Sequence, residues 1–367
     1  MPFSRSVATR IQPYFGYRNN TRLFLTARAL RSPPAKLGKA SGLRAFRTML
    51  AKFASREVPG VSVRLVAKFG GKVVIDCRRE TDAEGFVHFD EVIDPGIDLP
   101  KRTMWESVTL EWFNSDGQQS IAANILAPSA TASMGVISDI DDTIIESGIT
   151  GGLRNVARNW RRVLAQMPTE RIAVPGAADF YTSLGGQTLN TRDDGLHAPA
   201  RPFFYVSSSP WNLFSYLVAF QKAHRLPHGP LMLRDWGLNR ETFGSGSHGE
   251  HKRAAIASIL GSYPEMRFAM IGDDTQGDLP AFAQAAKAHP GQVAGVFLRK
   301  AATEDFSPEE LTAKAQLEAD GIPLWVGESF ESAKDFLETL GIENDDDAAQ
   351  IIHTIEDEAE EAESSPA

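Results

Sequence analysis

The pattern of apolar residues changes near residue 132, and the pattern beyond that point constrains the fold more than any other feature of the chain. From there on, apolar runs of strand length alternate with segments of helical periodicity. The apolar runs are 134–138, 203–207, 231–236, 267–271, 292–298 and 323–326. The helical segments lie near 210–224, 249–260, 279–288, 308–319 and 329–340. Because strands that are apolar throughout need cover on both faces, we predict an α/β domain built on a doubly wound, Rossmann-like parallel sheet.

Residues 61–128 show a different pattern, in which short runs with period-two alternation are separated by Gly and Asp turns. This pattern is typical of antiparallel strands, so we predict a small all-β sandwich at residues 59–130. The predicted organisation is completed by a basic N-terminal region at 1–58, the α/β domain at 131–342 and an acidic disordered tail at 343–367.

The composition fits about two globular domains, because the chain has 367 residues of which 42% are hydrophobic and 23% charged. The single cysteine, Cys77, cannot form an internal disulfide, which favours a reducing compartment. No apolar run approaches the roughly 18 residues of a spanning helix, and the first residues lack a secretory-type apolar core. We therefore expect a cytoplasmic protein, with an organelle transit segment at the Arg-rich amino end as the alternative.

The net charge of −9 hides a strong asymmetry. Residues 1–60 hold twelve Lys or Arg and one acid, whereas residues 343–367 hold ten acids and no Lys or Arg. The acidic block repels itself and predicts a solvated tail. The basic end is either a plain solvated face or a surface for anionic lipid or nucleic acid. Since its aromatic residues follow no RNA-binding pattern, we expect no nucleic-acid partner.

Acidic residues follow two of the predicted parallel strands directly. The first strand opens into Asp139, Asp141 and Asp142, and the fourth opens into Asp273, Asp274 and Asp278. Crowded carboxylates repel one another unless protons or a cation hold them together. Oxygen ligands without clustered Cys or His favour Mg²⁺ over Zn²⁺, so a shared magnesium site is one reading. The alternative is a polar turn that caps the next helix.

Two further segments carry groups suited to an anion. Hydroxyl groups at Ser207 to Ser209 precede Pro210 and a helical segment, where they either bind phosphoryl oxygens or serve as an ordinary N-cap. Lys252 shares a helical face with Ile256 and Leu260, so its ammonium either meets a buried anion or snorkels to the surface.

Taken together and in this order, the four segments resemble the haloacid dehalogenase superfamily of aspartate-nucleophile phosphatases. The D-x-D-x-T element from Asp139 to Thr143 is the specific part of this resemblance. It implies that Asp139 is the nucleophile and that Asp141 is the acid that protonates the leaving oxygen and then activates water. The remaining implied roles are phosphoryl binding by Ser207 and Lys252, Mg²⁺ binding by Asp139, the carbonyl of Asp141 and Asp273, and support from Thr143 and from Asp274 or Asp278.

The sequence motifs around these residues resemble a narrower family, the Mg²⁺-dependent phosphatidate phosphatases typified by the fungal actin-patch-associated enzyme. They are VISDIDDTIIESGIT, FFYVSSSPWNLF, GPLMLRDWG, GEHK and MIGDDTQGD. The resemblance implies hydrolysis of phosphatidate to diacylglycerol. The alternatives are the same chemistry on a soluble phosphoester, or an idle module that binds lipid or phosphate. Intact Asp139, Asp141, Lys252 and Asp273 argue against an idle site.

A basic amphipathic helix is predicted ten residues after Thr143. Apolar residues recur at helical spacing between Leu153 and Leu164, and the other side carries arginines. Members of the superfamily often carry a lid here, so we expect a short lid insertion near 148–200. The helix either packs on the domain or lays Trp160 into a lipid surface, which would make the protein peripheral at a membrane with an anionic phospholipid as its partner. The residues expected at that surface are Arg154, Arg158, Trp160, Arg161 and Arg162.

Overall fold

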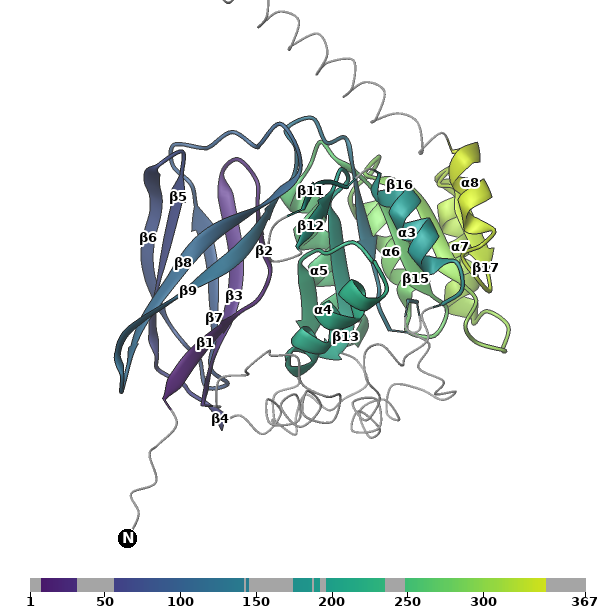
Figure 1. Cartoon of the computed structure of the whole chain (residues 1–367). Coiled ribbons are helices and arrows are strands. Elements are labelled where there is room, and N and C mark those ends of the chain that lie inside the picture. The colour runs from purple at the N-terminus through teal and green to yellow at the C-terminus, as the bar shows by residue number, and fades with distance from the viewer. Residues whose placement is uncertain are drawn as a thin grey trace, which may run out of the picture.

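The computed structural model describes residues 8–31, 56–141, 143–144, 174–186, 188–191, 196–234 and 248–340. An antiparallel sheet and a parallel sheet flanked by helices lie side by side (Figure 1). The chain is therefore a mixed α/β protein with two distinct sheets.

The parallel sheet has the strand order β14-β13-β10-β15-β16-β17. Its strands are β10 (Met134–Ser138), β13 (Phe203–Pro210), β14 (Leu231–Arg234), β15 (Arg267–Asp273), β16 (Val293–Arg299) and β17 (Leu324–Gly327). All neighbouring pairs are parallel, and each strand coincides with one of the six predicted apolar runs. Numbered along this domain, the order is 3-2-1-4-5-6, which is that of a Rossmann-type sheet.

Helices cover both faces of the parallel sheet, as its apolar strands require. The helices are α3 (Ala177–Gly185), α4 (Phe214–Ala223), α5 (His248–Ser262), α6 (Asp278–Ala288), α7 (Pro308–Ala319) and α8 (Ala333–Thr339), with a 3₁₀ turn, η1 (Trp211–Leu213), before α4. Side chains of α3, α4 and α8 share one buried core with the sheet, whereas those of α5, α6 and α7 share another. The predicted doubly wound arrangement agrees with these two cores.

Helix α3 belongs to the core of this domain, although the sequence placed its residues within a lid insertion near 148–200. Phe180, Tyr181 and Leu184 are fully buried. The helix has only nine residues and lies between Gly176 and Gly186, so its periodicity is too brief to stand out in the sequence. The first part of the predicted insertion, 148–173, lies outside the described residues.

The antiparallel half forms one nine-stranded sheet with the main path β1-β3-β2-β9-β8-β5-β6, in which β4 and β7 also pair with β3. Its pairs are antiparallel except that of β2 with β9, which is parallel. Its strands are β1 (Thr9–Pro13), β2 (Gly16–Arg18), β3 (Arg22–Arg31), β4 (Arg56–Glu57), β5 (Ser62–Phe69), β6 (Lys72–Glu80), β7 (Phe86–Val92), β8 (Met104–Asn114) and β9 (Gly117–Ala127). Apolar side chains of β3 and β7 share one buried core with those of β5, β8 and β9. A separate two-stranded sheet of β11 (Thr188–Thr191) and β12 (His197–Pro199) contacts β8, where Trp105 Nε1 donates to His197 O at 3.0 Å.

The antiparallel sheet begins at Thr9, about fifty residues before the predicted start of the β region. The sequence signal is weak here because β1 and β2 are short and because Ala27 and Ala29 occupy core positions of β3. Several arginines of the basic N-terminal region are paired within this half of the molecule. The pairs are Arg18 with Glu106, Arg22 with Asp90 and Arg28 with Glu57. Residues 9–31 of the predicted basic region at 1–58 thus contribute three strands to this sheet.

Aromatic side chains join the two halves of the molecule. Tyr14 packs against Trp211 at a centroid distance of 4.3 Å and against Phe214 at 4.9 Å. Tyr17 meets Phe204 edge-on at 5.5 Å. These contacts anchor the antiparallel half to β13 and to the segment that directly follows it.

Arg28 of β3 reinforces this junction from a buried position. Its guanidinium donates to Asn212 Oδ1 at 2.7 Å and to Glu57 Oε1 at 2.7 Å, and it lies 4.2 Å from the centroid of the Phe86 ring. Arg28 is the buried member of this group, since Asn212 and Glu57 are exposed, so its removal takes a buried, fully bonded charge out of the junction.

We expect Arg28→Ala to lower the free energy of unfolding by about 2 kcal/mol, because it removes the hydrogen bonds and the ring contact together. Urea unfolding followed by circular dichroism measures the loss. The matched control is Arg22→Ala, which also changes an arginine of β3 but breaks an exposed pair with Asp90 of β7. It should lower the free energy of unfolding by less than about 1 kcal/mol. Equal effects of the two variants would show that Arg28 is no anchor.

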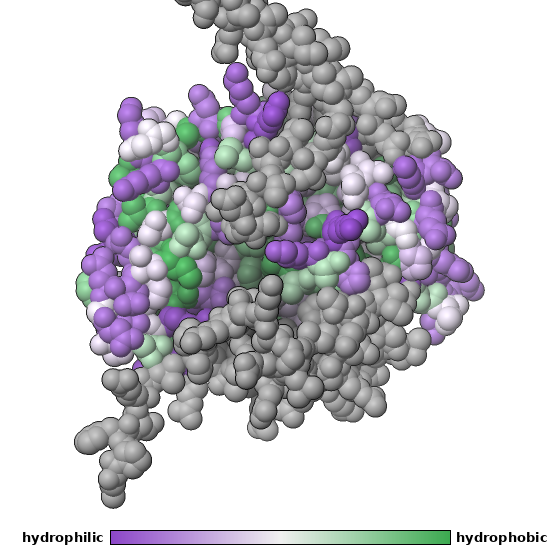
Figure 2. Space-filling model, viewed as in Figure 1, coloured by the Kyte–Doolittle hydropathy of each residue, from purple (hydrophilic) through white to green (hydrophobic). Residues whose placement is uncertain are grey.

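The described surface mixes polar and apolar side chains, as Figure 2 shows for one face. Among the described residues, the exposed large apolar side chains are Val73, Val92, Met104, Phe113, Leu311 and Val326. They are spread over β6, β7, β8, α7 and β17, so they do not indicate one apolar docking patch. Within the described ranges, the helices are too short or too polar to cross a membrane.

Candidate active site

The acidic segments predicted from the sequence meet at the carboxyl ends of β10 and β15, which are neighbours at the centre of the parallel sheet. The chain order reverses at β10, since β13 lies on one side of it and β15 on the other. In open α/β sheets, the crevice beyond the strand ends at such a reversal is where ligands bind. A hydrogen bond from Asp139 N–H to Ile271 O, 2.8 Å long, joins the two strand ends.

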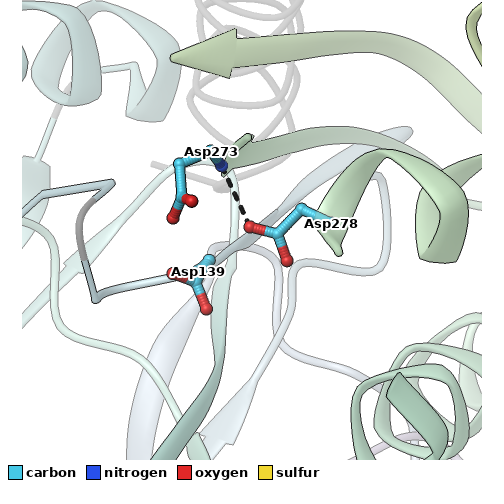
Figure 3. Close-up of side chains that lie close together, drawn as sticks. All are labelled: Asp139, Asp273 and Asp278. Atoms are coloured by element: carbon cyan, nitrogen blue, oxygen red, sulfur yellow. Dashed lines mark hydrogen bonds between the residues drawn. The ribbon is translucent and has the colours of Figure 1, made fainter. Parts of the chain in front are cut away.

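Three buried carboxylates form the centre of the site. Asp139 follows β10, Asp273 ends β15 and Asp278 begins α6, and each offers an oxygen within 4.8 Å of the other two (Figure 3). Asp278 turns back over the strand end, where its Oδ2 accepts a 3.0 Å hydrogen bond from Asp273 N–H. A Cβ on Gly272 would lie 2.5 Å from that same Oδ2, so glycine is required at this position. The turn between β15 and α6 thus brings the third carboxylate to the other two.

Lys252 supplies a buried positive charge next to the three carboxylates. Its Nζ lies 2.9 Å from Asp139 Oδ1 and also donates to Asp278 Oδ1. The Lys252 side chain is only 2% exposed, so its ammonium meets a buried anion and does not extend to the surface. One ammonium against three carboxylates leaves a net negative charge when all are ionised.

Burial and mutual repulsion change the proton affinities of this cluster. Burial raises the pKa of Asp139 well above its usual range, and this effect outweighs the opposing attraction of Lys252. Burial, followed by repulsion from Asp278, raises the pKa of Asp273 to about 7. Burial lowers the pKa of Lys252, but Asp139 and Asp278 outweigh burial and raise it above its ordinary value, so the lysine stays charged. The cluster therefore takes up protons or a cation at neutral pH.

The donor set of the cluster fits a hard divalent cation. All three side chains offer carboxylate oxygens, and the group includes no sulfur or imidazole. A divalent ion would offset the negative charge that the single lysine leaves uncompensated.

We expect Mg²⁺ to stabilise the folded protein more at about pH 8 than at about pH 5. Because the pKa values of Asp139 and Asp273 are raised on folding, the folded chain binds more protons than the unfolded chain between about pH 4 and pH 7. The free energy of unfolding of the metal-free protein therefore falls as the pH rises through this window. Above it the cluster is most negative and binds a cation best.

Thermal unfolding with Mg²⁺ or with EDTA at both pH values measures this effect. The gain in Tm should be about 5 °C at the higher pH and about 1 °C at the lower. Sodium at equal ionic strength serves as the control for screening. Equal gains from Mg²⁺ at both pH values would contradict the assignment of these carboxylates as the cation site.

Hydroxyl groups order the carboxylates. Thr143 Oγ1 donates to Asp273 Oδ2 at 3.0 Å and lies 3.3 Å from Asp139 Oδ2. The backbone N–H and the hydroxyl of Thr275 both donate to Asp273 Oδ1 at 2.5 Å. Thr143 was expected to support the site from the sequence, whereas Thr275 was not.

Asp141 lies outside the cluster of three and is held by serines that follow β13. Ser207 Oγ donates to Asp141 Oδ2 at 2.6 Å, and Ser209 Oγ lies 2.8 Å from the same oxygen and 3.0 Å from Oδ1. The Asp141 carbonyl, expected from the resemblance to bind metal, lies 3.4 Å from Gln276 Nε2. Sequence reasoning named the hydroxyl groups of Ser207 to Ser209 and assigned phosphate binding to Ser207, but it did not pair Ser209 with Asp141 and did not single out Gln276.

Asp274 and Asp278, which the sequence left as alternatives, have different surroundings. Asp278 joins the carboxylate cluster, whereas Asp274 accepts a 2.5 Å hydrogen bond from Lys300 Nζ and others from the amides of Ala301 and Ala302. Asp274 thus holds the segment after β16.

A tyrosine from α3, Tyr181, lies behind the carboxylate cluster. Tyr181 OH lies 2.7 Å from Ser138 Oγ, and the Ser138 hydroxyl donates to the Asp139 carbonyl oxygen at 2.6 Å. All three residues are buried. The contact explains why α3 is required next to the site, and no motif in the sequence pointed to it.

Several predicted residues cannot be located relative to the site. Asp142 and the expected lid residues Arg154, Arg158, Trp160, Arg161 and Arg162 lie outside the described residues. Their assignment to a membrane or lid surface stays a prediction.

Known proteins similar to this chain match mainly the half that contains the parallel sheet. Residues 134–300 match the family model described as phosphatidate phosphatase APP1, catalytic domain. Phosphatidate phosphatase APP1 of Saccharomyces cerevisiae is 30% identical over 181 residues, which cover 49% of this chain and 28% of the relative. An uncharacterized protein of Schizosaccharomyces pombe is 25% identical over 233 residues, or 63% of this chain and 36% of the relative. The matches thus span about a third of the length of these relatives.

Solved structures add no support for the fold. A glycosyl hydrolase family 2 member from Bacteroides cellulosilyticus overlaps 89% of this chain and 44% of its own, with 9% identity and a TM-score of 0.23. A likeness this weak carries no argument.

Proposed function

We propose that this chain, whose residues 134–300 match the catalytic-domain model of phosphatidate phosphatase APP1, is a Mg²⁺-dependent phosphatase that hydrolyses phosphatidate to diacylglycerol and phosphate. The observation that carries the proposal is the buried cluster at the sheet switch point, in which Asp139, Asp273 and Asp278 surround Lys252. A haloacid dehalogenase-like fold for 131–342 and a sandwich for the antiparallel half are part of the same proposal.

In the first step, a carboxylate oxygen of Asp139 bonds to phosphorus as the bond between phosphorus and the glyceryl oxygen breaks. Asp141 gives its proton to that glyceryl oxygen, so diacylglycerol leaves neutral. Lys252 and the Ser207 hydroxyl hold the phosphoryl oxygens, whose charge they help to offset.

In the second step, water hydrolyses the phosphate ester of Asp139. Asp141, now ionised, takes a proton from water as the water oxygen bonds to phosphorus and the bond to the Asp139 oxygen breaks. Phosphate leaves, Asp139 returns as a carboxylate and Asp141 is protonated again. When bound at Asp139, Asp273 and the carbonyl of Asp141, Mg²⁺ would keep the carboxylates ionised and offset charge on the transferred group, with Asp278 in support.

The lipid substrate receives separate support from the sequence of the basic amphipathic segment. Arginines at 154, 158, 161 and 162 beside Trp160 suit an anionic lipid surface and would make the protein peripheral at a membrane. The same catalytic residues would also serve a soluble phosphoester, so the substrate class must be tested directly.

The test is phosphate release from phosphatidate in mixed micelles and from a soluble alkyl phosphate, each with Mg²⁺ and with EDTA. We expect Mg²⁺-dependent release from the lipid at a higher kcat/KM than from the soluble ester. Release from the soluble ester alone would keep the phosphatase and overturn the lipid substrate. No release from either would overturn the proposed enzyme and leave a binding module.

A further inference from the structure

The two serine hydroxyl groups that contact Asp141 are not equivalent, because only that of Ser207 lies at the position expected to bind phosphate. Ser207 and Ser209 are 0% and 5% exposed, and both lie against the Asp141 carboxylate. Ser207 Oγ accepts a 2.9 Å hydrogen bond from the Ser209 N–H, which fixes its position, and it directs its one proton to Asp141.

A phosphoryl group at the site would compete for that proton. A serine hydroxyl has a single hydrogen, so Ser207 cannot donate to a phosphoryl oxygen and to Asp141 at once. Once Ser207 turns to the phosphoryl group, Ser209 remains on the Asp141 carboxylate. A hydroxyl donates to an ionised carboxylate and also to the carbonyl oxygen of a protonated one, so Ser209 can hold Asp141 in both protonation states while the acidic proton points to the leaving oxygen.

We infer that Ser209 is the positioning residue for the acid–base group Asp141, and that substrate binding transfers the Ser207 hydrogen bond from Asp141 to the phosphoryl group. The inference rests on the proposed function, because it assigns Asp141 the proton transfer to the leaving oxygen. It goes beyond that function by giving Ser209 a role that neither the resemblance nor the family match assigns to it.

The role predicts a dependence on the leaving group. An alkoxide such as that of diacylglycerol leaves only when it is protonated, whereas nitrophenolate leaves readily without a proton. Ser209→Ala should therefore lower kcat/KM, which reports formation of the Asp139 ester, by about thirtyfold for phosphatidate, a part of the roughly 10²–10⁴-fold that a general acid supplies. It should lower kcat/KM for p-nitrophenyl phosphate by less than about threefold, whereas kcat falls on both substrates because Asp141 is also the base of the shared second step.

A double-mutant cycle separates positioning from a structural role. If Ser209 acts through Asp141, then Ser209→Ala should cause no further loss in the Asp141→Asn background. The matched control is Ser262→Ala, which removes a hydroxyl of similar exposure (8%) that donates to Ser258 O at the far end of α5. This control should slow neither substrate.

The experiment measures kcat and KM of the full chain with Mg²⁺ on both substrates for wild type, the single variants and the double variant. A larger loss on phosphatidate, together with non-additivity, is the expected result. Equal losses of kcat/KM on both substrates, or additive effects in the cycle, would overturn the role of Ser209 while leaving the phosphatase intact. A wild type that hydrolyses neither substrate would overturn the proposed function and the inference with it.

Discussion

Asp139→Asn should reduce phosphate release by at least about a thousandfold while leaving the metal-free protein as stable as wild type or more stable. The amide has the shape of the carboxylate but is a poor nucleophile, so the first displacement fails. The same change removes one of three carboxylates that repel one another in a buried site, and burial raises the pKa of Asp139, which shows that its charged form is disfavoured there. Loss of activity with retained stability is typical of residues that are kept for function.

Phosphate release and urea unfolding in EDTA, measured on the same preparation, test both parts of this prediction. Asp116→Asn in the exposed turn between β8 and β9 is the matched control and should change neither quantity. Activity of Asp139→Asn within tenfold of wild type would rule out Asp139 as the nucleophile.

Lys252→Met should lower the free energy of unfolding of the metal-free protein by about 3–5 kcal/mol and reduce kcat/KM by at least about a hundredfold. Methionine keeps the apolar stem but removes the ammonium that contacts Asp139 and Asp278. The three buried carboxylates would then lack their lysine, and protons or a cation would have to replace its charge. We therefore expect Mg²⁺ to restore part of the stability but not the activity, because the lysine is also assigned to the phosphoryl oxygens.

Urea unfolding with Mg²⁺ and with EDTA gives the two stabilities. Lys287→Met, on the exposed last turn of α6, makes the same substitution and should change stability by less than about 0.5 kcal/mol. A stability loss below about 1 kcal/mol in Lys252→Met would show that the lysine does not neutralise the cluster.

The parallel sheet was predictable because its strands are buried on both faces and therefore read as uninterrupted apolar runs. All six runs became strands, and the acids that follow two of them meet at one edge. The first strands of the antiparallel sheet were missed, since β1 and β2 have five and three residues and Ala side chains fill part of the β3 core face. Helix α3 was missed because nine residues give too few turns for a clear period.

Within the site, sequence spacing identified the residue types but not the surroundings of each residue. Asp274 and Asp278 both follow β15, and only the path of the turn brings Asp278 back over Gly272 to the cluster. Gly277, with φ of 74°, precedes α6 and allows that turn. The pairing of Ser209 with Asp141 and of Tyr181 with Ser138 depends on contacts between strands and helices that are distant in the sequence.

The central claim, that Asp139 attacks phosphorus, is tested most directly by trapping its phosphate ester. Wild type and Asp141→Asn would be mixed with p-nitrophenyl phosphate and Mg²⁺, quenched in acid within one turnover, digested and examined by mass spectrometry. We predict a phosphate on Asp139 that accumulates in Asp141→Asn, because nitrophenolate leaves without a proton from Asp141, whereas hydrolysis of the ester needs that residue as a base. Phosphate release without any label on Asp139, or with the label on another residue, would contradict the account.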